Sequence, residues 1–278
     1  MTNEIPLPEA ALKRIERMHT GASNTSMLSV AASYSLADIG FDTVGEAMGC
    51  AVMNTSGVYY PPCRMYNRSG GAFQISMSPW GASYQEVIDN GWSNTKARIR
   101  EEARLIGADG VIGITISRSE LEPGAQEFLM VGTAIRSRGS TRSKRPFLTS
   151  LKGNDFAKLI ASGWITADLL VDTILEVAHN DYSAVMQNSL FAANTEIDTF
   201  TRIVNNARNR GRDRHIEDVG RIGASGSIIS HSALRIFHHE PAEGHVDFIA
   251  ETTIIGSALT HFNVVEQRPT LRYISLKK

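Results

Sequence analysis

Four of the eight histidines of this chain fall in the stretch SHSALRIFHHEPAEGHVD, among several acidic residues. The pattern predicts a β-hairpin whose loop is Glu240–Gly244, so that His239 faces His245 across the ladder. Asp247 then lies on the same side of the hairpin, because side chains alternate between the two faces of a strand. His239, His245 and Asp247, with a glutamate of the loop, would form a site for a divalent transition metal such as Zn²⁺, Ni²⁺ or Cu²⁺. The alternative is a polar hairpin tip whose imidazoles are solvated or contact a neighbouring subunit.

No other residue pattern adds a reaction to this site. The chain has no G-x-S-x-G, no G-x-G-x-x-G and no G-x-x-x-x-G-K-[ST] motif. Cys50 follows a glycine in an apolar run and has no histidine near it in sequence to act as a base. We therefore expect a protein that is not an enzyme and that needs no cofactor other than the metal the hairpin could hold.

A second candidate site is the segment Gly57–Trp80, which is rich in aromatic residues and carries a Pro-Pro and a Gly-Gly pair. Aromatic side chains on an irregular loop can form a ligand pocket or a partner surface. We single out Tyr59, Tyr60 and Trp80 for that role. The alternative is a loop that folds over its own core.

A third candidate site is the basic stretch RSRGSTRSKR, which has no periodic apolar residues and is typical of a solvated linker. Its basic side chains could contact an anion: Arg136, Arg138, Arg142, Lys144 and Arg145. The net charge of the chain is −1, so the protein as a whole gives no signal for nucleic acid. Any such binding should weaken steeply with salt, and we do not expect a nucleic-acid partner.

The elements that would position these residues occur twice. ARLIGADGVIGITI at Ala103–Ile116 is matched by GRIGASGSIISHSA at Gly220–Ala233, and both contain Ile-Gly-Ala-x-Gly. A helical pattern of apolar residues precedes each glycine, which would cap the helix in the left-handed conformation. Two β-rich runs follow each glycine, and a strand precedes each helix, at Val44–Asn54 in the first copy and Leu159–Leu170 in the second.

Each copy therefore contains a strand, a long helix and a hairpin. A repeat of this size is as long as a whole domain, which indicates a duplicated domain. The predicted fold class is α+β, with two tandem domains that each pack an antiparallel sheet on a long helix. The chain then divides into an N-terminal helical arm, a first repeat, a basic linker, a divergent second repeat and a C-terminal tail strand: residues 1–25, 26–137, 138–147, 148–262 and 263–278.

Three motifs place the first copy beside a known family. VGEAMG at Val44–Gly49, ARLIGADGVIGITI and FLMVGTAI at Phe128–Ile135 occur in this order around a long helix. In these motifs the first copy resembles the YbjQ-like family, often labelled heavy-metal-binding. The second copy keeps the order but has Ser225 in place of Asp109. The resemblance implies a small α+β fold with an antiparallel sheet that forms ring-like homo-oligomers, typically pentamers, and it implies no set of metal ligands here.

Composition narrows the setting. Apolar residues make up 42% and charged residues 21% of the 278 residues, a globular balance. No run of about 18 apolar residues exists, the N-terminus lacks a signal-peptide core, and two cysteines cannot form a disulfide framework. We therefore expect a cytoplasmic protein without a membrane partner.

These observations favour a non-enzymatic protein that forms a ring- or shell-like homo-oligomer. Its partner is then a second copy of itself, and the resemblance implies five chains. The long apolar strands and the strand-like tail TLRYISLKK would supply contacts to a neighbouring chain. The alternative function is a metal- or small-ligand-binding module that uses the second hairpin or the aromatic segment.

Overall fold

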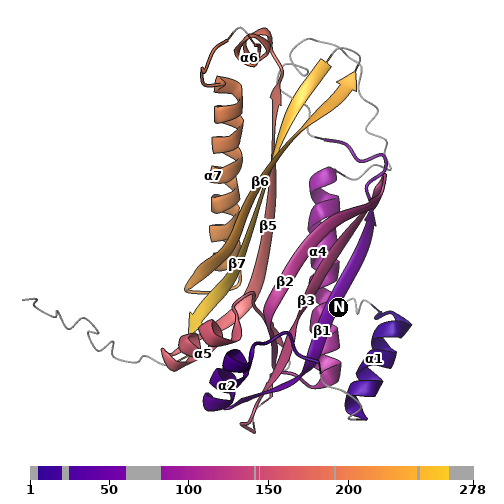
Figure 1. Cartoon of the computed structure of the whole chain (residues 1–278), viewed down its shortest axis with the longest axis vertical. Coiled ribbons are helices and arrows are strands. Elements are labelled where there is room, and N and C mark those ends of the chain that lie inside the picture. The colour runs from indigo at the N-terminus through magenta and orange to yellow at the C-terminus, as the bar shows by residue number, and fades with distance from the viewer. Residues whose placement is uncertain are drawn as a thin grey trace, which may run out of the picture.

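A computed structural model of the chain shows two β-sheets side by side, each with a long helix packed along it (Figure 1). The structure describes residues 6–20, 25–60, 83–140, 142–143, 145–190, 192–242 and 245–262. A strand, a long helix and a hairpin occur in this order in each half. The α+β class predicted from the sequence is therefore confirmed.

The first unit is a sheet in the strand order β1-β3-β2-β4 with one long helix, α4. Its elements are β1 (Phe41–Asn54), α4 (Tyr84–Ile106), β2 (Gly110–Glu122), β3 (Ala125–Ser137) and β4 (Phe147–Leu148). Strands β1 and β2 run antiparallel to β3, whereas β4 runs parallel to β2. Helix α4 begins where the Ser83 hydroxyl accepts the Glu86 N–H, and it ends at Gly107, whose φ of 76° forms the predicted left-handed cap.

The second unit is a sheet in the order β5-β7-β6, packed on helix α7. Its elements are β5 (Trp164–His179), α6 (Tyr182–Gln187), α7 (Asp198–Arg221), β6 (Gly226–Ala242) and β7 (His245–His261). The strand predicted at Leu159–Leu170 was placed too early, because the residues before Trp164 form helix α5 (Gly153–Ala161). Helix α7 continues through Gly211, where the missing Cβ makes room for Thr252 of β7.

Two further helices complete the described chain, α1 (Glu9–His19) and α2 (Val30–Asp38). Helix α1 packs on α4 and buries Ile15 there. Helices α2 and α5 contact each other and cover the lower end of the first sheet, where Leu36 and Phe156 meet Ile135 of β3 (Figure 1). Among the helices of the described ranges, none is long and apolar enough to cross a membrane.

Strands β1, β3 and β2 of the first sheet match strands β5, β7 and β6 of the second, and β4 has no counterpart among the described strands. Ala47 of β1 pairs with Gly132 of β3, and Leu170 of β5 pairs with Gly256 of β7. A β-bulge interrupts the pairing just before Ala47 and again just before Leu170. These shared irregularities show that the sequence repeat is a repeat of structure.

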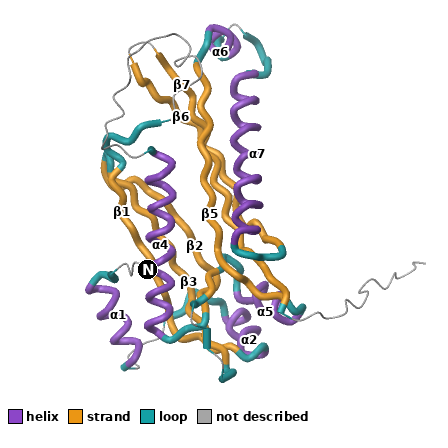
Figure 2. The backbone as a smooth tube through the Cα atoms, turned by 180° about the vertical axis from the view of Figure 1, so that it is seen from behind, coloured by secondary structure: helices purple, strands orange, loops and turns teal. Residues whose placement is uncertain are grey.

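Helix α4 lies between the two sheets, as Figures 1 and 2 show from opposite sides. One face of the second sheet joins the buried cluster of α4, through Leu169, Leu175, Ile249 and Ile255. The other face packs on α7 and forms a separate cluster, with Ile203, Ala207, Phe248 and Ala250. The second sheet is therefore covered by α7 on one face and by α4 of the first unit on the other.

Ion pairs reinforce this junction between the units. Asp168 at the bulge of β5 lies 3.0 Å from the Lys96 Nζ and 2.6 Å from an Arg100 nitrogen, both on α4. Arg118 of β2 donates to Glu251 of β7. Because these groups are largely buried, the two units are held as one body.

Candidate functional sites

The hairpin of β6 and β7 is tighter than the sequence pattern predicts. Strand β6 extends to Ala242, which pairs with His245, so the connection is shorter than the predicted loop Glu240–Gly244. His239 consequently pairs with Asp247, and the predicted pairing of His239 with His245 was wrong. The register shifts between His239 and Ala242, where the strand continues through residues that the pattern assigns to the loop.

A cluster of two histidines and one aspartate stands at this end of the second sheet. His179 Nδ1 lies 3.3 Å from Asp247 Oδ1, and His245 Nε2 lies 3.1 Å from the same oxygen. The two imidazole rings stack with centroids 4.4 Å apart. His179 ends β5 and pairs with Asp247 across the ladder, so adjacent strands position all three groups. Asp247 is only 2% exposed, whereas both histidines are partly open to solvent.

His239 does not join this cluster. It lies on the β6 side of Asp247, and its ring packs on Tyr60 with ring centroids 4.6 Å apart. Burial lowers the pKa of His239, although the Asp247 charge acts in the opposite direction. The structure thus brings together His245 and Asp247 of the three candidate ligands and adds His179, which sequence reasoning missed.

The spacing of the cluster suits a metal with three protein ligands. Two donor atoms on one tetrahedral Zn²⁺, each at about 2.1 Å, lie roughly 3.4 Å apart. The two nitrogen–oxygen distances in the cluster, 3.1 and 3.3 Å, are close to that separation. All three ligand atoms lie within 4.8 Å of one another, so small side-chain rotations would close the set around one ion.

A second polar group that the sequence did not reveal is the buried chain Asp172–His215–Ser227. His215 Nδ1 lies 2.6 Å from Asp172 of β5, and His215 Nε2 lies 2.8 Å from the Ser227 hydroxyl of β6. The ring passes over Gly256 of β7, where an added Cβ would lie 2.7 Å from it. The connectivity is that of a serine hydrolase triad.

The burial of Asp172 and His215 between α7 and the sheet indicates a structural role for this hydrogen-bonded group. His215 is 3% exposed and lies on the face of α7 that packs on the sheet. Its two nitrogens hold α7 to both outer strands of the sheet at once, across the middle strand. Burial of an imidazole and a carboxylate costs desolvation free energy, and this cost is offset because each group has a hydrogen-bond partner.

The aromatic candidates separate in the structure. Tyr59 pairs with Ser83 in an isolated β-bridge, directly before α4. Tyr60 packs on Tyr84 and Phe237, with ring centroids 4.9 and 5.7 Å away, and lines a cavity with them at the junction of the units. Burial raises the pKa of Tyr60 to about 12, so its hydroxyl stays protonated at neutral pH. Trp80 lies outside the described residues.

The basic candidates have partners within the chain. Arg138 pairs with Asp42 at 2.7 Å, Arg142 donates to the Gly139 carbonyl at 2.8 Å, and Arg145 lies 3.6 Å from Asp168. Lys144 lies outside the described residues. An anion would compete with these partners, and anion binding by this stretch stays a prediction.

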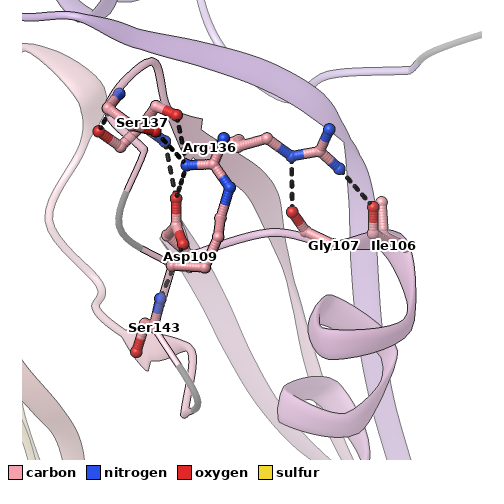
Figure 3. Close-up of polar contacts among 8 residues, drawn as sticks. Ile106, Gly107, Asp109, Arg136, Ser137 and Ser143 are labelled. Atoms are coloured by element: carbon pink, nitrogen blue, oxygen red, sulfur yellow. Dashed lines mark hydrogen bonds and ion pairs between the residues drawn. The ribbon is translucent and has the colours of Figure 1, made fainter.

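The Gly-Ala-Asp-Gly turn of the first copy also has a structural explanation (Figure 3). Asp109 accepts the backbone N–H of Ser137 at 2.8 Å and that of Ser143 at 3.1 Å. Arg136 donates to the carbonyls of Gly107 and Ile106, which end α4. The turn therefore ties the end of the helix to the end of β3 and the basic stretch. In the second copy Ser225 replaces Asp109, so this carboxylate is missing.

Comparison with known proteins agrees with this architecture. Residues 73–138 match the YbjQ family, described as "Putative heavy-metal-binding". The match covers the long helix and the hairpin of the first unit, so this unit is similar in sequence to the YbjQ family. No catalytic activity is known for this family.

Its relatives are of two kinds. The Encapsulin nanocompartment protein Rv1762c of Mycobacterium tuberculosis is 26% identical over 224 residues, covering 78% of this chain and 80% of that protein. UPF0145 proteins of Thermus thermophilus and Methanococcus vannielii are 38% and 35% identical over 53 and 52 residues. Those matches cover 19% of this chain and 46% and 50% of the UPF0145 proteins, about half of their length. No solved structure matches the chain significantly.

Proposed function

We propose that the protein is a non-enzymatic building block of a cytoplasmic, ring- or shell-like homo-oligomer. The observation that carries this proposal is strand β6, a 17-residue strand at the edge of the second sheet. From Gly226 to Glu240 its side chains are all exposed or half-buried, and Ile228, Ile229 and Ile236 are exposed apolar residues. A long apolar edge strand is a template for pairing with another chain, so natural proteins usually cover it.

The relatives support assembly as well. The name of the Mycobacterium tuberculosis relative refers to an encapsulin nanocompartment, and the alignment with it spans both units of this chain. The number five rests on the family resemblance alone. The proposal therefore commits to a closed cyclic oligomer and takes five as the expected number of chains.

We expect the purified protein to have about five times the chain mass of 30.4 kDa. Size-exclusion chromatography with light scattering measures the mass at micromolar concentration, and native mass spectrometry gives the number of chains and any bound ligand. A stable monomer would overturn the proposal. A uniform oligomer of another size would keep the assembly and correct the number.

The predicted tail strand, residues 263–278, lies outside the described residues. A precedent in the first unit supports its proposed role of adding a strand to a neighbouring chain. There Thr149 and Leu151 follow the edge of β2, and their carbonyls accept the N–H groups of Ile114 and Gly113. The sequence Ser-Leu-Lys at 150–152 recurs in the tail at 275–277. Deleting residues 270–278 should lower the oligomer mass, and an unchanged mass would remove this role.

We infer a second function, metal binding, from the cluster of His179, His245 and Asp247. Titration of the metal-free protein with Zn²⁺ by calorimetry should show one site per chain, because nitrogen and oxygen donors at this spacing suit that ion. The double variant His179→Ala/His245→Ala should lose the site. His231→Ala is the matched control, because His231 is an exposed histidine elsewhere on β6 and should leave the isotherm unchanged. Equal isotherms for the double variant and the wild type would exclude the site.

A further inference from the structure

The two units of the chain differ in how their long helices are covered. Helix α4 packs on its own sheet and also contacts the second sheet: the Gln85 side chain donates to the Thr173 carbonyl at 2.7 Å, and Lys96 and Arg100 reach Asp168. Helix α7 has one buried stripe, which faces its own sheet. Because the units are copies, α7 has a second face that corresponds to the face of α4 on the other sheet. No second sheet of the described chain packs on that face of α7.

The residues of that second face follow from the alignment of the capping glycines Gly107 and Gly223. The counterparts of Gln85, Lys96 and Arg100 on α7 are Thr201, Arg212 and Ile216. Arg212 is exposed, and Ile216 is 67% exposed, which is unusual for an isoleucine on a long helix. We call these three α7 residues the outer stripe.

The first sheet has a matching face that no long helix of the described chain covers. Val171, Leu175 and Ile255 lie on the face of the second sheet that covers α4. The counterparts of these residues in the first sheet follow from the pairs Ala47–Gly132 and Leu170–Gly256, and they are Met48, Val52 and Val131. We call these three residues the outer face. None of these three residues belongs to a hydrophobic cluster of the described residues, and Val52 is 54% exposed.

The charges around these surfaces fit each other. Glu127 lies beside the outer face and is the counterpart of Glu251, which binds Arg118 and Arg235 at the junction of the units. Helix α7 presents Arg208 and Arg212 on its solvent side. A glutamate on the sheet face and arginines on the helix face attract and orient each other.

The internal ion pair of the junction points the same way. Arg100 and Asp168 form a buried pair within the chain. Their counterparts are Ile216 on α7 and Gly45 at the bulge of β1. Neither Ile216 nor Gly45 carries a charge, so packing α7 on the first sheet would bury no unpaired member of this pair.

We propose that α7 of one chain packs its outer stripe on the outer face of the first sheet of a second copy. The contact repeats the junction that already joins the two units of one chain, and it deepens the proposed assembly by naming the surfaces. It is head-to-tail, because the two surfaces differ, and each chain offers one of each. Such a contact closes into a ring when its rotation divides a full turn.

Two variants test the contact. Ile216→Asp places a carboxylate on the outer stripe, and Val52→Asp places one on the outer face; both positions are solvent-exposed, so both chains should fold. Each variant alone should have a lower mass than the wild type by light scattering. Leu190→Asp is the matched control, because Leu190 is a fully exposed leucine away from both surfaces, and it should keep the wild-type mass.

Mixing the two variants gives the decisive result. The Val52→Asp chain keeps an intact α7, and the Ile216→Asp chain keeps an intact first sheet, so a head-to-tail contact predicts a 1:1 complex on mixing. Wild-type mass in both single variants would overturn the inference while leaving the proposed assembly intact. Lower mass in both variants without a complex on mixing would overturn the head-to-tail geometry. A monomeric wild type would instead refute the assembly itself.

Discussion

Asp168→Ala should lower the free energy of unfolding by about 3–5 kcal/mol, the usual loss when one partner of a buried ion pair is removed. The Asp168 carboxylate is 8% exposed and binds Lys96 and Arg100 of the first unit from a strand of the second. Burial lowers the pKa of both cations, and the Asp168 charge opposes that shift. Without the carboxylate, two cations remain in the junction with no anion to offset their desolvation.

Urea unfolding of the full chain at pH 7 measures this loss. Asp155→Ala is the matched control, because Asp155 is exposed and lies at 4.0 Å from Lys158, a pair that should contribute little. A midpoint for Asp168→Ala equal to that of the control would show that the junction does not depend on this carboxylate. An additional early transition would show that the two units separate before they unfold.

The repeat and the helix ends could be predicted because their signals are local. Gly107 closes α4 in the left-handed conformation, as the pattern of apolar residues before it predicts. The two β-rich runs predicted after Gly107 are strands β2 and β3, and only Pro123 and Gly124 lie between them. In both cases the chain must bend at a residue that suits the bend.

The second hairpin shows where such a local signal fails. Pro241 indicates a loop, yet it lies within β6. Strand β6 is at the edge of the sheet, where a residue without an N–H need not leave a hydrogen bond unmade. The position of a strand in its sheet was not available from the sequence, so the predicted register, and with it the pairing of His239, was wrong.

The polar groups that build the sites meet across long distances in the sequence. His179 closes β5 and meets Asp247 only because β5 and β7 are neighbours in the sheet. A signal for His215 did exist: it follows Ala207 and Gly211 at four-residue steps, on the buried stripe of α7. Arg212 and Arg214 beside it are typical of a solvated helix face, and no local pattern names its partner Asp172.

Gly49→Ala should lower the free energy of unfolding by about 3 kcal/mol, the upper end of the usual range for overpacked cores. The Cβ would lie 2.1 Å from the Thr95 carbonyl oxygen and 2.8 Å from the Ile99 nitrogen. Both are backbone atoms of α4, so no side-chain rotation removes the clash. In the second copy the counterpart of Gly49 is Asp172, which instead reaches α7 through its hydrogen bond to His215.

The position of α4 between two sheets is what makes this substitution severe. A helix on an open surface could move outward by the width of a methyl group, whereas α4 is held from behind by Leu175 and Ile255 of the second unit. Urea unfolding measures the loss, with Gly226→Ala as the control, because nothing lies within 4 Å of a Cβ at Gly226. If both variants unfolded at the same urea concentration, α4 would have room to retreat, and the close packing of the two units around it would be disproved.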